Sequence, residues 1–115
     1  MRGDPEWLER EFAQAGNARI GCGFITWSLA RNPGLLAGVL RHEPAAVMLS
    51  FGDPRPFSSA IHSAGAKLIC QVQTVAQACE AMEAAADVIV AQGTEAGGHG
   101  QPEPLVTLLP LVVDA

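Results

Sequence analysis

The sequence has little positive charge. Its Lys and Arg side chains number seven against twelve Asp and Glu, Lys67 is the only lysine, and the formal net charge is -5 at pH 7. Proteins that bind nucleic acid or an anionic membrane surface do so with clusters of Lys and Arg, and no such cluster occurs along the chain. We therefore expect neither nucleic acid nor a membrane as a partner.

Cysteine is scarce and long apolar runs are missing. Cys22, Cys70 and Cys79 are odd in number and lack C-x-x-C spacing, and no basic stretch followed by an apolar one opens the chain. We predict a reduced, cytoplasmic protein whose cysteines act as small hydrophobic side chains. No apolar run approaches the roughly 20 residues that cross a bilayer, and Pro110 interrupts the longest candidate, so the chain is expected to be soluble.

Two familiar kinds of site are incomplete. Glu95 and His99 could bind a metal together, but a third ligand nearby is missing, so we predict no metal site. Gly21-x-Gly23 lacks the third glycine of the dinucleotide-binding fingerprint and falls inside a predicted strand, which argues against a Rossmann fold.

Four short apolar segments alternate with helical patterns. The chain has 115 residues, enough for one domain with a sizeable core. The apolar segments are continuous, which is typical of parallel strands buried on both faces; they are 20–25, 46–50, 68–72 and 88–91. Helical spacing covers 5–15, 33–40, 56–64 and the segment after residue 74. The sequence predicts an α/β fold of parallel β/α units without a second domain.

Local signals mark the ends of the helices. Asp4 is the predicted N-cap and Gly16 the C-cap of 5–15, and Thr74-x-x-Gln77 has the spacing of a capping box. An apolar stripe over 105–113 predicts a last helix. Pro110 either interrupts this helix or marks its true start, because proline removes one helical hydrogen bond.

A glycine-rich loop with the sequence Q-G-T-E-A-G-G-H-G follows the last predicted strand at 92–100. Parallel strands point their C-terminal ends at one edge of the sheet, where we expect this loop to meet 24–27, 50–54 and 71–74. Gly97 and Gly98 allow positive φ and the close approach of a ligand, and Gln92 offers a donor and an acceptor. These groups suit a flat polar heterocycle.

His99 is the candidate base of this loop. A histidine is mostly neutral at neutral pH and can accept a proton or hydrogen-bond an anion, although a solvent-facing loop histidine is the simpler alternative. Glu95 could orient the imidazole. The segment Phe51-Gly52-Asp53-Pro54 is explained by turn chemistry, although it ends a strand at the same edge.

Three stretches together resemble the nitronate monooxygenase family: A-Q-G-T-E-A-G-G-H-G after D-V-I-V, the segment V-M-L-S-F-G-D-P, and G-A-K-L-I-C-Q-V-Q-T-V between them. The resemblance implies a TIM (β/α)8 barrel that binds FMN. His99 matches the histidine that serves as base or substrate-binding group, and Gln92 and Gly97 match flavin-contacting positions, with Gly98 beside them. Gly23 stands where many members have Asn, so one flavin hydrogen bond is missing or comes from water.

The family reaction implied by the resemblance oxidises alkyl nitronates or nitroalkanes with O2 to carbonyl compounds and nitrite, so the expected partners are a small nitro compound and oxygen. The E-A-G-G-H loop is shared with flavin-dependent enoyl-acyl-carrier-protein reductases, which are an alternative. A further alternative is a non-catalytic remnant or association module.

A complete barrel takes about 250 residues, whereas this chain has only four predicted strands. The expectation is about half of a barrel over residues 1–115, without the first strand and without the late strands whose loops hold the phosphate. Such a half-sheet exposes edges and an apolar face, so we also expect self-association or a need for the missing residues.

Because the phosphate-binding loops are expected outside these residues, the 115-residue chain alone should bind FMN weakly or not at all. The measurement is the visible spectrum of the purified chain after incubation with FMN and gel filtration. A stoichiometric flavin spectrum would refute this prediction.

Overall fold

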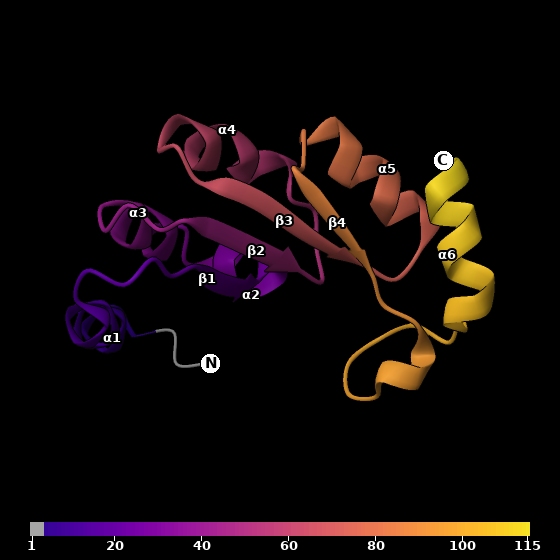
Figure 1. The fold of residues 1–115 in the computed structure, drawn as a ribbon, viewed down its shortest axis with the longest axis horizontal. Helices are drawn as coiled ribbons and strands as arrows, with labels where there is room; N and C mark the ends of the chain where they lie inside the picture. Colours follow the sequence, from indigo (N-terminus) through magenta and orange to yellow (C-terminus); the bar gives the residue numbers. More distant parts are fainter. Residues whose placement is uncertain (1–3) are drawn as a thin grey trace.

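Four parallel strands form one sheet in the order β1-β2-β3-β4 in the computed structural model, which describes residues 4–115 (Figure 1). The strands are β1 (Cys22–Ile25), β2 (Ala46–Ser50), β3 (Lys67–Val72) and β4 (Val88–Ala91). The predicted parallel β/α units are confirmed, and β2 and β4 have the predicted bounds. The first strand begins two residues later than predicted, at Cys22 rather than Ile20.

The helices follow the strands in alternation. They are α1 (Pro5–Ala15), α2 (Thr26–Arg31), α3 (Gly34–Leu40), α4 (Arg55–Ser63), α5 (Val75–Glu83), the 3-10 turn η1 (Thr94–Ala96) and α6 (Leu105–Asp114). The short helix α2 directly follows β1 and was not predicted. None of the helices within residues 4–115 has the length and apolar character needed to cross a membrane.

The predicted caps of α1 and α5 are largely confirmed. The Asp4 side chain accepts from Glu6 N at 2.9 Å, and Gly16 ends α1 with φ of 58°. Thr74 Oγ1 accepts from Gln77 N at 3.1 Å, but Gln77 Oε1 accepts from Gln73 N at 2.7 Å rather than from Thr74 itself. The first turn of α5 therefore binds both residues of the preceding loop, Gln73 and Thr74.

Pro110 lies inside α6 and does not begin it. The helix begins at Leu105, and the carbonyl that loses its partner belongs to Val106, a residue 82% exposed, where water can replace the bond. The predicted apolar stripe is only half correct: Leu108 is buried and Val112 packs on the core, while Leu109 and Val113 are exposed.

Helices cover one face of the sheet. The row Phe24, Leu49 and Cys70 points toward the helices and is buried, and Figure 1 shows α3, α4 and α5 on the same side of the strands. The opposite rows form what we call the uncovered face: Gly23, Met48, Ile69 and Val88, then Ile25, Ser50, Gln71 and Val90.

The prediction that the strands are buried on both faces is wrong for this chain. Val88 is 49% exposed and Val90 is 38% exposed. The strands are apolar on both faces, but within the described residues helices pack on only one of them. The uncovered face is therefore an apolar surface bounded by the two edge strands β1 and β4.

Cys70 lies at the centre of the covered face, where burial raises the pKa of its thiol to about 11. At about pH 8 only about one thiol in a thousand is then ionised, so N-ethylmaleimide should leave Cys70 unmodified in the folded chain and label it after unfolding in urea. Peptide mass spectrometry measures this. Labelling of Cys70 as rapid in the folded as in the unfolded chain would contradict it.

Candidate functional site

The C-terminal ends of the four strands lie together at one edge of the sheet, which we call the rim. Trp27 N after β1 donates to Phe51 O after β2 at 3.2 Å. Ser50 Oγ at the end of β2 donates to Gln71 Oε1 on β3 at 3.0 Å. The segment after β3 is joined to the segment after β4, where Gln73 Nε2 donates to Gln92 Oε1 at 2.7 Å. The predicted convergence of the strand ends is confirmed.

His99 lies in the exposed loop that follows β4. Its ring centroid is 5.9 Å from that of Phe51, and the two rings are tilted by 58°. Its carbonyl oxygen accepts from Gln92 Nε2 at 3.2 Å. The imidazole thus lies next to an aromatic ring from the turn after β2, and His99 is exposed to solvent.

Gln92 is half-buried, and both ends of its amide contact the protein. Its Oε1 accepts from Gln73, and its Nε2 donates to the carbonyl of His99. An amide oxygen has a second lone pair and an amide nitrogen a second hydrogen, so the side chain keeps one acceptor and one donor for a ligand. Within the protein, the Gln92 side chain holds the loop that contains His99.

The glycines assigned to a ligand are unobstructed. Gly97 and Gly98 have φ of 73° and 65°, values that other residues rarely adopt. A Cβ added to either would meet no atom within 4 Å, and one added to Gly23 would meet only Met48, at 3.9 Å. Because Gly23 lies on the uncovered face, a flat ring could approach from that side, so these residues fit a planar heterocycle.

Glu95 does not orient the imidazole. Both carboxylate oxygens accept from Leu105 N, at 3.1 and 3.0 Å, so this side chain caps the N-terminus of α6. Thr94 N also donates to Glu103 O at 2.9 Å, which closes the loop at its base. No group of three or more potential metal ligands occurs within residues 4–115.

Three residues of the rim were missed in the sequence. Phe51 has φ of 61°, a strained conformation for a side chain of this size that is common at functional sites. Gly93 is buried, and a Cβ on it would meet Leu105 N at 2.5 Å. Gln73 is 1% exposed. In the sequence, Phe51 belongs to a turn motif, Gly93 is one of several glycines in its loop, and Gln73 is a polar residue before a helix. None of these patterns distinguishes a functional residue from an ordinary one.

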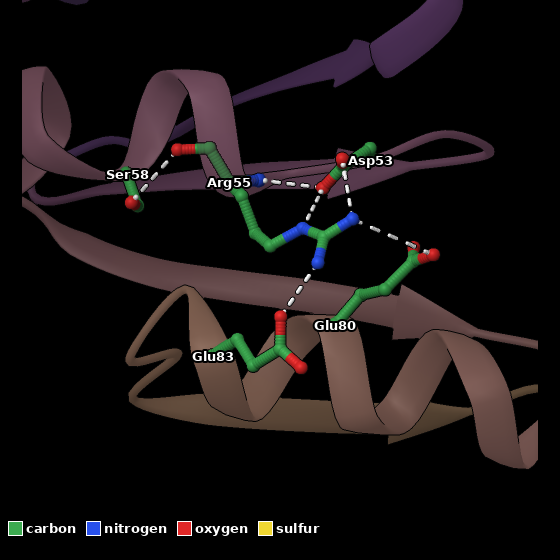
Figure 2. A network of polar contacts seen from close by, with 5 residues as sticks. All are labelled: Asp53, Arg55, Ser58, Glu80 and Glu83. Carbon is green, nitrogen blue, oxygen red and sulfur yellow. Dashed lines mark hydrogen bonds and ion pairs between the residues drawn. The ribbon is translucent and has the colours of Figure 1, made fainter.

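A network of charges ties the rim turn after β2 to α5 (Figure 2). The Arg55 guanidinium donates to both carboxylate oxygens of Asp53, each at 2.9 Å, and to Glu83 Oε2 at 2.6 Å. Hydrogen bonds from Arg55 hold the pKa of the Asp53 carboxyl below its usual range. All these groups are substantially exposed, so water and salt weaken the pairs.

Replacing Asp53 by Asn should remove a pH-dependent part of the stability. A lowered pKa in the folded state adds stability above the ordinary value of 3.8, and this is lost as the pH falls through the folded pKa. The difference in unfolding free energy between parent and Asp53→Asn should therefore be larger at about pH 7 than at about pH 2. Urea melts at both pH values measure it, with Glu11→Gln on α1 as control, and a difference independent of pH would contradict it.

The chain is similar in sequence to nitronate monooxygenases. The nitronate monooxygenase family model matches residues 13–115. A nitronate monooxygenase of Pseudomonas aeruginosa is 40% identical over 96 residues, which cover 82% of this chain and 27% of that protein. The nitronate monooxygenase npaC of Metarhizium robertsii is 35% identical, over 84% of this chain and 30% of its own length. The chain thus spans roughly three-tenths of the length of these curated relatives.

The fold has a match among solved structures. The structure of FabK from Thermotoga maritima superposes with a TM-score of 0.83 at 23% identity, covering 96% of this chain and 36% of that one. At this identity the likeness concerns the fold, and it supports the prediction that the chain forms about half of a (β/α)8 barrel. The family match over almost the whole chain and the curated relatives place the chain in the nitronate monooxygenase family.

Proposed function

We propose that the chain forms part of an FMN-dependent oxidoreductase that oxidises alkyl nitronates or nitroalkanes with O2 to carbonyl compounds and nitrite. The observation that supports this most directly is the rim, where an exposed histidine stands beside unobstructed glycines at the end of parallel strands. A location in the cytoplasm is part of the same proposal.

The cofactor would lie over the rim against Gly97, Gly98 and Gly23. The free donor and acceptor of Gln92 would face its polar ring edge. When bound, FMN supplies the redox chemistry, and the protein supplies position and hydrogen bonds. The open space next to each of these three glycines suits a planar ring, because any side chain there would occupy the space the ring needs.

His99 would act on the substrate. A neutral imidazole can remove the proton from the carbon next to the nitro group of a nitroalkane, and the resulting imidazolium can bind the nitronate oxygens. The Phe51 ring, 5.9 Å away, would form an apolar wall for the alkyl part and limit the access of water. Neither role requires a metal.

A second candidate activity is that of a flavin-dependent enoyl-acyl-carrier-protein reductase. The E-A-G-G-H loop at residues 95–99, which resembles that of these reductases, favours it, whereas the family match and the named relatives favour the nitronate reaction. Consumption of NADH with an enoyl thioester, without nitrite release, would select the reductase.

An association module is the alternative outside catalysis. The uncovered face, with Val88 and Val90 exposed, favours it, since apolar surfaces of this kind often pair. A self-associated chain without flavin in solution, together with no nitrite release by the full-length protein, would select this role.

The test of the proposed function is His99→Asn in the full-length protein. Turnover of a neutral nitroalkane, measured as nitrite release, should fall by about 10² to 10⁴, while a preformed nitronate, which needs no deprotonation, should lose less. His62→Asn on α4, where His62 pairs with Asp87 away from the rim, is the matched control. Unchanged nitroalkane turnover in His99→Asn would rule out the base.

A further inference from the structure

Gln73 is one of two buried polar side chains among residues 4–115 and is 1% exposed. We infer that it is a positioning residue for His99 and acts through the amide of Gln92. This inference rests on the proposed function for the role of His99, but the arrangement itself can be measured without any turnover.

The connection consists of two hydrogen bonds in series. Gln73 Nε2 donates to Gln92 Oε1 at 2.7 Å, and Gln92 Nε2 donates to the carbonyl oxygen of His99 at 3.2 Å. Gln73 directly follows β3, and Gln92 directly follows β4. The two side chains therefore fix the backbone of the loop around His99 relative to the ends of β3 and β4.

The donor and acceptor of both hydrogen bonds are determined by the carbonyl oxygen of His99. A carbonyl oxygen can only accept, so Gln92 must present its NH₂ group to His99 and its oxygen to Gln73. Gln73 must then donate. A donor at position 73 thus determines which way the Gln92 amide faces, and an acceptor there would turn it around.

Both glutamines are themselves held at their backbone. Gln73 N donates to Gln77 Oε1 at 2.7 Å, in the first turn of α5. Gln92 N donates to Val72 O at 2.8 Å, as a continuation of the sheet ladder. The backbone of both glutamines is therefore fixed by hydrogen bonds, so their side chains can hold the glycine-rich segment around His99 in place.

The segment they hold has little other support. Within the described part of the chain, the bond from Gln92 is the only hydrogen bond to residues 98–100. His99 is flanked by Gly98 and Gly100, whose backbones have wide conformational freedom. Without this bond the imidazole would lose its place beside Phe51.

The experiment compares Gln73→Glu, Gln73→Met and the control Gln14→Glu on α1 with the parent by NMR, all in the full-length protein. The two readouts are the NOE between the His99 and Phe51 rings and the backbone order parameters of residues 98–100. Gln73→Met removes the hydrogen bond, and Gln73→Glu, at nearly equal size, replaces the donor by an acceptor when its carboxyl is ionised. In both, the NOE should disappear and the order parameters should fall below about 0.6, whereas Gln14→Glu should match the parent.

Retention of the NOE and of parent-like order parameters in folded Gln73→Met would overturn the inference. If Gln73→Glu does not fold, Gln73→Met decides by the same two readouts. The proposed function is tested separately by nitrite release in His99→Asn, so a mobile loop together with unchanged His99→Asn turnover would reject the base and keep the positioning role. In the full-length protein Gln73→Met should lower kcat for a nitroalkane at least tenfold with little change in KM.

Discussion

The parallel register of the four strands is the constraint on which the rest of the structure depends. Because Ile25, Ser50, Gln71 and Val90 lie opposite one another across the sheet, the four strands end within one residue of the same level. The loops after them can then reach one another with single side chains, as Gln73 reaches Gln92. A shift of two residues in one pairing would move these groups by about 7 Å, beyond hydrogen-bonding distance.

The same register divides the molecule into a packed side and an open side. Buried side chains such as Phe24 and Leu49 anchor the helices on one face, and this makes the rim rigid enough to hold a loop. The opposite face carries Gly23 and the exposed Val88 and Val90. Since the relatives are more than three times as long as this chain, we propose that further β/α units cover this face in the complete protein.

Much of the fold could be predicted because it depends on local patterns. Continuous apolar runs located β2 and β4, and Asp4 with Pro5 located the start of α1. The sequence left open whether Pro110 lies inside the last helix or begins it, because its effect depends on the exposure of Val106, a tertiary property. Glu95 misled because its partner, Leu105 N, lies ten residues further along the chain, and no local pattern shows that the loop returns there.

The sequence by itself determined the parallel β/α class, the family and the chemistry available in the Gln92–Gly100 loop, because periodicity and motif spacing are properties of neighbouring residues. Only the tertiary structure decided what each group of the rim contacts. It places Phe51, in a left-handed conformation, beside His99. It also shows that the oxygen of the Gln92 amide accepts a hydrogen bond from Gln73. These contacts join residues 19 to 48 positions apart, and the register of the sheet, not the local sequence, sets their distances.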